Sequence, residues 1–172
     1  MGFLGLSLLF VGFTLIHNGV CILKKVPPKT MAFVNAVTGT ILFVINIVSV
    51  ANAVKTGAAA EVYAYAAQGL LFAVTYYLLA ASLFFGMDFF IVGLYGTFAA
   101  VNAAVIAFLT FRMGGSINIL MGFLWIAWFV LWGEMFLENI LKLPLKKFPA
   151  FLLIFEGLFA AWAPALYFLF FM

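Results

Sequence analysis

Long apolar runs fill almost the whole chain, and short polar breaks separate them. The runs cover approximately residues 2–23, 31–53, 62–85, 89–111, 117–141 and 149–171. Each is close to the roughly 20 residues that a helix needs to cross a bilayer, and none alternates like a barrel strand. The breaks are too short to hold a soluble domain. The pattern therefore predicts an all-α membrane protein with six transmembrane helices in a single domain, residues 1–172.

Composition agrees with a lipid environment, because 69% of the residues are hydrophobic and only 8% are charged. Such a chain has too few polar side chains to cover a water-soluble surface. The single cysteine, Cys21, allows no internal disulfide, and no cluster of His and Cys predicts a metal site. No glycine-rich phosphate loop is present either. We therefore expect no enzyme activity, no cofactor and no nucleic-acid partner, and we expect membrane lipids around the chain.

Basic residues in the breaks predict the orientation in the membrane. The first, third and fifth breaks contain six lysines: Lys24, Lys25, Lys29, Lys142, Lys146 and Lys147. The second and fourth breaks contain only Lys55 and Arg112. Cytoplasmic loops carry the excess of Lys and Arg, so the lysine-rich breaks are predicted to face the cytoplasm and both termini the outside. The first run lacks a basic region and a cleavage site, and we expect it to be retained.

The fifth run carries a row of tryptophans on one helical face. At about 100° per residue, Trp125, Trp128 and Trp132 lie close together, whereas Glu134 and Glu138 lie on the far side. Anchoring at the membrane surface does not explain tryptophans near the middle of a span. Two alternatives stay open, namely packing between helices and the aromatic wall of a narrow pathway. Glu134 has no charged neighbour in the sequence, and no partner is predicted for it.

Other runs carry rows with a similar spacing. The first run has an aliphatic row beside three glycines: Leu4, Leu8, Val11 and Leu15, with Gly5, Gly12 and Gly19. Small residues allow helices to approach closely in lipid. The third run places Phe72 and Tyr76 one turn apart. The second run has a polar row, for which hydrogen bonds between helices are expected rather than contact with a solute: Asn35, Thr38, Asn46 and Ser49.

Carboxylates inside apolar runs need partners, because burying a charge in hydrocarbon is costly. Glu138 precedes Lys142 by four residues, so an ion pair along the helix is predicted. Glu156 lies about seven residues into the last run. It is expected to be neutral or hydrogen-bonded to Tyr76, Trp132 or backbone N–H groups.

Two breaks resemble each other, which predicts a repeated helical hairpin. NGVCILKKVPPKTMAF and ENILKLPLKKFPAF each contain Asn, then a turn rich in Lys and Pro, then a new apolar run. The alternative is that every cytoplasmic turn selects Lys and Pro.

Four stretches resemble the AmiS/UreI family of bacterial urea and short-chain amide channels: LGLSLLFVGFTLIHNGVCILKKVPPK, GLLFAVTY, WIAWFVLWGEMFLENILKLPLKKF and FEGLFAAWAPA. The most specific motifs, W-x-x-W-x-x-x-W, E-N-I-L-K-x-P and E-G-x-x-x-A-W-x-P, occur in order in the last two runs. The resemblance implies a twisted bundle of three helix hairpins with a pore in each protomer. It also implies a hexamer around a lipid plug, in the bacterial cytoplasmic (inner) membrane.

The resemblance further implies which residues line the pore: Leu4, Leu8, Val11, Leu15, Phe72, Tyr76, Trp125, Trp128, Leu131, Trp132 and Glu156. The implied function is passive passage of urea or small neutral amides. Acid-activated members have histidine-containing loops outside the membrane, whereas this chain has AVKTGAAAE and RMGGSIN, so acid gating is not expected. The alternatives are a proton-coupled amide transporter that uses a buried Glu and a packed structural protein without a lumen.

Overall fold

Helices follow all six apolar runs in the computed structural model, which describes residues 2–172. The elements are α1 (Gly2–Lys24), α2 (Pro28–Thr56), α3 (Ala60–Phe85), α4 (Phe90–Met113), α5 (Ser116–Asn139), α6 (Phe148–Glu156), the π-helix η1 (Gly157–Trp162) and α7 (Ala163–Phe170). The last three form one continuous span, so six helices are long and apolar enough to cross a membrane. Residues 2–172 contain no strand. The predicted all-α class with six spans is confirmed.

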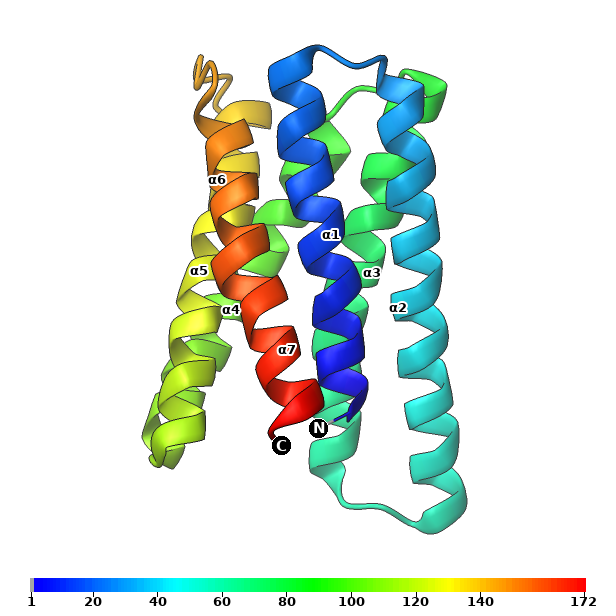
Figure 1. Ribbon diagram of the computed structural model, residues 1–172, viewed down its shortest axis with the longest axis vertical. Coiled ribbons are helices and arrows are strands. Elements are labelled where there is room, and N and C mark those ends of the chain that lie inside the picture. The colour runs from blue at the N-terminus through cyan, green and yellow to red at the C-terminus, as the bar shows by residue number, and fades with distance from the viewer. Residues whose placement is uncertain (1) are drawn as a thin grey trace.

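The six spans form a ring in the order of the chain. Each span packs against the spans before and after it, and α1 packs along α6, η1 and α7 to close the ring (Figure 1). The closest pairs are α2 with α3, α4 with α5, and α1 with the last span. Within residues 2–172, side chains rather than a helix fill the centre of the ring.

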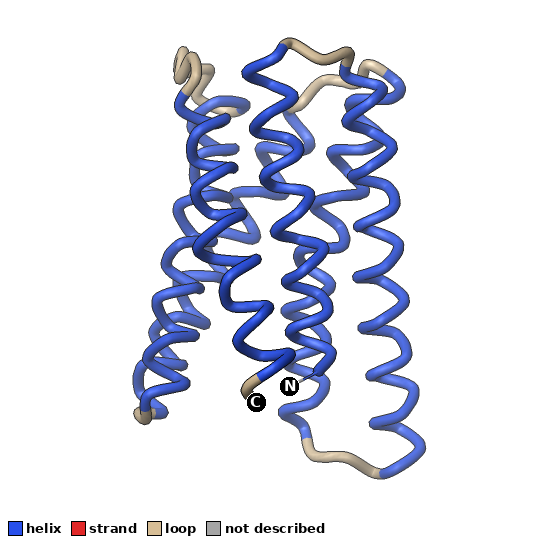
Figure 2. The backbone as a smooth tube through the Cα atoms, in the orientation of Figure 1, coloured by secondary structure: helices blue, strands red, loops and turns tan. Residues whose placement is uncertain are grey.

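The two similar lysine-rich links do not mark closely packed hairpins. They join α1 to α2 and α5 to α6, which pack less closely than the pairs α2/α3 and α4/α5. Both links lie at one end of the bundle, and the two termini lie toward the other end with the α2–α3 and α4–α5 links (Figure 2). The two like turns therefore join antiparallel spans at the same end of the bundle, although these spans are not the most closely packed pairs.

Polar side chains join α1 to α2 inside the bundle. Asn18 and Asn35 exchange two hydrogen bonds between their amide groups, of 3.0 and 2.9 Å, and the hydroxyl oxygens of Thr14 and Thr38 lie 2.6 Å apart. The prediction of bonds between helices is confirmed for Asn35 and Thr38. The other two members of the polar row donate to carbonyls of their own helix: Asn46 and Ser49.

Replacing Asn35 by Leu should lower the free energy of unfolding by about 1–2 kcal/mol, because the buried Asn18 amide loses both of these hydrogen bonds. Replacing Asn18 and Asn35 together by Leu should recover part of this loss, since no amide is left without its partner. Denaturant unfolding in detergent micelles measures both effects. A double variant less stable than the single one would contradict this explanation.

Glycines on α1 permit its close approach to the last span. A Cβ atom built on Gly12 would lie 2.8 Å from the Trp162 backbone nitrogen and 3.0 Å from the Gly157 carbonyl oxygen. Gly5 and Gly19 also face the last span so closely that a Cβ atom would collide with it. The predicted role of these glycines in close helix packing is confirmed.

A π-helical segment separates Glu156 from Pro164 in the last span. The Ala163 N–H donates to the Leu158 carbonyl, five residues earlier, as in a π-turn. Proline lacks an N–H, and in a regular helix its ring would clash with the carbonyl four residues before it, here that of Ala160. The wider turns give room for Pro164 within a continuous span. They also place the Glu156 side chain directly before an irregular segment of backbone, a type of segment that is frequent at functional sites.

Candidate functional site

Side chains from α1, α3, α5 and α6 meet in the centre of the ring. Ten of the eleven candidate pore residues are at most 8% exposed: Leu8, Val11, Leu15, Phe72, Tyr76, Trp125, Trp128, Leu131, Trp132 and Glu156. Leu4 is only partly buried and packs against the same core near the start of α1. Residues predicted from three separate apolar rows thus belong to one contiguous cluster.

Four aromatic side chains, Phe72, Trp125, Trp128 and Trp132, form what we term the aromatic cluster. The Phe72 ring centre lies 6.3 Å from that of Trp125, 5.0 Å from Trp128 and 4.6 Å from Trp132. Phe72 is on α3 and the tryptophans are on α5, and α4 stands between these helices in the ring. The rings therefore meet across the centre of the bundle and do not fill a seam between neighbouring helices. Both alternatives from the sequence, core packing and the wall of a closed pathway, share this geometry.

The indole N–H groups of the aromatic cluster differ in their hydrogen bonding. Trp132 Nε1 donates to Thr75 Oγ1 at 3.1 Å, and the Thr75 hydroxyl donates to the Leu71 carbonyl at 2.8 Å. Trp128 Nε1 is buried and has no partner within residues 2–172. Sequence reasoning overlooked Thr75, although it lies three residues after Phe72 on the same side of α3, and this spacing was the available signal.

Glu156 is buried in the same core. It is 2% exposed, it lies near enough to Tyr76 for electrostatic interaction, and its Oε2 has no hydrogen-bond partner within residues 2–172. One predicted partner is wrong, because the Trp132 N–H is directed to Thr75 instead. The core thus contains a buried donor on Trp128 and a buried acceptor on Glu156 that the described chain leaves unsatisfied.

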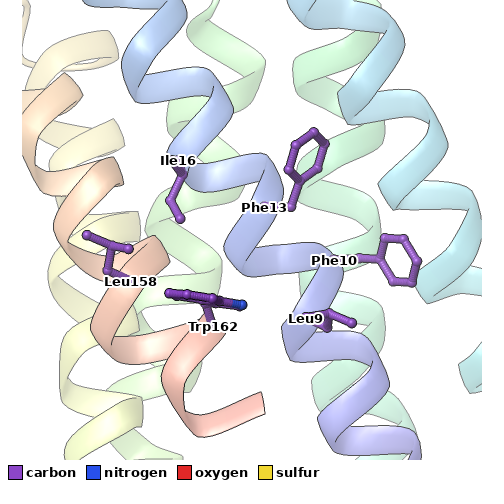
Figure 3. Close-up of a pocket in the computed structure, with 6 residues that line it drawn as sticks. All are labelled: Leu9, Phe10, Phe13, Ile16, Leu158 and Trp162. Atoms are coloured by element: carbon purple, nitrogen blue, oxygen red, sulfur yellow. The ribbon is translucent and has the colours of Figure 1, made fainter. Parts of the chain in front are cut away.

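The aromatic cluster closes the centre in this conformation, since Trp128 and Trp132 are each 1% exposed. A groove of about 300 Å³ on the outside of the bundle lies between α1 and the last span (Figure 3). Its lining is almost wholly apolar: Leu9, Phe10, Phe13, Ile16, Leu158 and Trp162. Passage of a solute through the centre therefore requires the rings to move.

The far side of α5 departs from the sequence prediction. Lys142 Nζ lies 4.0 Å from Asp88 Oδ1, and no ion pair between Glu138 and Lys142 forms. The predicted pair is wrong because α5 ends at Asn139 and Lys142 has a φ of 55°, so the two residues no longer face each other along a helix. Glu138 is exposed in the last turn of α5.

Comparison with known proteins gives consistent matches over nearly the whole chain. The sequence model of the AmiS/UreI family transporters matches residues 3–171. The chain is 37% identical over 185 residues to the acid-activated urea channel of Helicobacter pylori, covering 94% of this chain and 95% of that protein. It is 33% identical over 138 residues to the putative transporter protein AmiS2 of Rhodococcus erythropolis, covering 80% and 63%.

Two solved structures have the same fold. The cryoEM structure of the Helicobacter pylori urea channel in its closed state matches with a TM-score of 0.87 at 38% identity, over 94% of both chains. The crystal structure of the urea channel from the same organism matches with a TM-score of 0.87 at 39% identity, over 96% of this chain and 97% of that one.

Proposed function

Because this chain belongs to the AmiS/UreI family of transporters, we propose that it is a passive channel for urea and other small neutral amides. Its relatives are a channel and a putative transporter, not enzymes. The pathway runs through the centre of each protomer's own helix ring. The observation that carries this proposal is the contact of Phe72 with the tryptophans of α5 across the ring.

The walls of the pathway suit a flat, neutral solute. Aromatic faces contact the plane of urea or acetamide, while isolated polar atoms exchange hydrogen bonds with its edges. We assign these roles to the two unsatisfied atoms, with Trp128 Nε1 donating to the solute carbonyl and Glu156 Oε2 accepting from a solute N–H. An ion would lose its water shell, and the lining contains no ring of opposite charges to offset the cost, which amounts to several kcal/mol. Neutral amides pass and ions do not.

We also assign the membrane, the orientation of the chain, the residues of the lining and the assembly. The chain is a multi-pass membrane protein, and we place it in the bacterial cytoplasmic membrane with the lysine-rich end inside and both termini outside. We assign the lining to the predicted residues of the four helices: Leu4, Leu8, Val11, Leu15, Phe72, Tyr76, Trp125, Trp128, Leu131, Trp132 and Glu156. A homo-oligomer, a hexamer by resemblance to the family, is the expected assembly.

Stopped-flow light scattering on proteoliposomes tests this function. A passive channel speeds urea and acetamide equilibration without a proton gradient, whereas a coupled carrier requires one. Vesicles with the protein that equilibrate no faster than empty vesicles would overturn the proposed function.

Glu156→Gln should leave urea flux within about threefold of the parent protein, because the amide keeps an acceptor oxygen of similar size. Glu156→Leu removes the acceptor and should lower flux about tenfold or more, as expected for one lost hydrogen bond in a buried site. Flux is measured as above, with folding checked by gel filtration. Complete loss of flux in Glu156→Gln would support a carrier that needs a titratable carboxyl.

Urea flux should change less than about twofold between about pH 5 and 7.5, because the outer links contain no histidine. Their charged residues are the exposed Lys55, Glu61 and Arg112. The acid-activated relative aligns over 185 residues, more than the 172 of this chain, so it carries insertions that this chain lacks. Flux measured in vesicles across this pH range tests the point. A several-fold rise on acidification would show that gating resides elsewhere in the chain.

A further inference from the structure

A groove on the outside of the bundle, between α4 and α5, contains a buried carboxyl group. The groove has a volume of about 440 Å³ and mostly apolar walls, which include Val101, Phe129 and Phe148. Glu134 also lines it, is only 6% exposed, and has no hydrogen-bond partner for Oε1 within residues 2–172. Leaving a buried carboxyl oxygen without a donor is costly. The groove therefore lacks a hydrogen-bond donor.

A second carboxyl group beside the first favours a donor that carries a positive charge. Glu138 stands one helical turn after Glu134 on α5 and interacts with it. Two carboxylates this close repel each other unless a proton or a cation lies between them. Within residues 2–172 neither of them forms an ion pair, because Lys142 lies beside Asp88 instead. A cation from outside the chain would satisfy both groups at once.

The depth of the two carboxyl groups indicates the headgroup of an amphiphile rather than a free cation. Glu134 lies five residues before the end of α5, about 8 Å along the helix axis. From there the groove continues toward the middle of the span along apolar side chains, among them Val101 and Phe129. A free metal ion or ammonium ion would leave these apolar walls uncovered. A molecule that joins an ammonium group to a hydrocarbon chain matches both parts of the groove.

Lysines beside the groove extend this match to an anionic group. Phe148 lines the groove, and the residue directly before it, Lys147, is exposed and forms no ion pair within residues 2–172. Lys147 belongs to the link between α5 and α6, at the end of the bundle where α5 ends (Figure 1). Positive and negative side chains thus occur together at one end of an apolar groove. A phospholipid with an amine headgroup carries the complementary pair of charges, phosphate and ammonium.

We propose that this groove binds one molecule of phosphatidylethanolamine. The ammonium group donates hydrogen bonds to Glu134 and Glu138, the phosphate lies beside Lys147, and an acyl chain covers the apolar walls. Phosphatidylcholine has the same charges but no N–H to donate, and phosphatidylglycerol has no cation, so both bind more weakly. The site is independent of the proposed function, which needs only the centre of the protomer, and either can fail alone.

Native mass spectrometry of protein extracted from vesicles with equal amounts of phosphatidylethanolamine and phosphatidylglycerol tests the headgroup contact. The parent protein should retain phosphatidylethanolamine, and Glu134→Gln should retain it at least about tenfold less, because the amide keeps the shape of the side chain and loses its charge. Glu61→Gln, which changes an exposed carboxylate near the start of α3, should retain it like the parent protein. Equal retention in the parent protein and Glu134→Gln, as for a groove filled by a second copy, or a preference for phosphatidylglycerol, would overturn the proposal.

Filling the groove tests the site without changing a carboxylate. Gly133 lines the groove, and no atom would lie within 4 Å of a Cβ atom built on it. Gly133→Leu should therefore fold, as gel filtration checks, and lose phosphatidylethanolamine at least about tenfold. Added phosphatidylethanolamine should raise the denaturant midpoint of the parent protein but not of Gly133→Leu, and phosphatidylcholine should raise neither. An equal rise in both proteins, or an equal rise with phosphatidylcholine, would refute the site.

Discussion

Trp132→Ala is expected to admit amides that are bulkier than urea. The Trp132 ring centre lies 4.6 Å from that of Phe72, and the side chain is 1% exposed, so its indole occupies the space where the helices across the ring meet. Its removal should raise the permeability to butyramide relative to urea about tenfold, equivalent to about 1.4 kcal/mol of barrier. Stopped-flow measurements with a series of amides of increasing size give this ratio directly.

Trp132→Phe is the matched control, because it keeps an aromatic ring while it loses the hydrogen bond to Thr75 and one of the two fused rings. It should retain most of the discrimination by size. Large-to-small changes in a core cost about 3–5 kcal/mol for Trp to Ala, so gel filtration must first show that the Ala variant is folded. A folded Trp132→Ala protein with an unchanged solute profile would remove this residue from the constriction.

Gly12→Ala should cause a large loss of stability for a single added methyl group. The new Cβ would lie 2.8 Å from the backbone nitrogen of Trp162 and 3.0 Å from the carbonyl of Gly157, and backbone cannot rotate away as a side chain does. Overpacking of this kind costs about 1–3 kcal/mol, and Gly12→Leu should cost more. The loss appears as a lower denaturant midpoint in micelles.

Gly133→Ala provides the control for this effect. No atom would lie within 4 Å of a Cβ atom on Gly133, so the methyl group meets open space. Alanine favours the helix by about 0.5–1 kcal/mol over glycine, so this variant should be as stable as the parent protein or slightly more so. Equal stability of Gly12→Ala and Gly133→Ala would contradict the close approach of α1 to the last span.

The fold class follows from the sequence because lipid imposes a simple rule: apolar runs of bilayer length must be helices. The order of packing does not follow from it. Hydropathy shows where α1 and the last span begin and end, but it does not show that they close the ring side by side. The glycines at positions 5, 12 and 19 predicted a close contact for α1, while its partner became evident only from the structure.

The spacing of residues along regular helices predicts part of the candidate site. The tryptophan row of α5, with Phe72 and Tyr76 on α3, could be drawn from the spacing of residues along regular helices. Periodicity fails where the helix ends, as with Glu138 and Lys142, because the chain turns into a left-handed conformation at Lys142. It also does not report which helices face each other across the ring, and for this reason Thr75 was not identified as the partner of Trp132.

Chemical blocking of the centre of the ring tests directly whether solute passes there. Leu131 is 3% exposed and belongs to the same buried core as the aromatic cluster. In a Cys21→Ser background, Leu131→Cys treated with the small neutral reagent methyl methanethiosulfonate should lose urea flux nearly to the level of empty vesicles and regain it on reduction. Phe129→Cys, on the outer surface of α5 at a position 41% exposed, should react without any change in flux. Unchanged urea flux after complete modification of Leu131→Cys, verified by mass spectrometry, would contradict a pathway through the centre of the protomer.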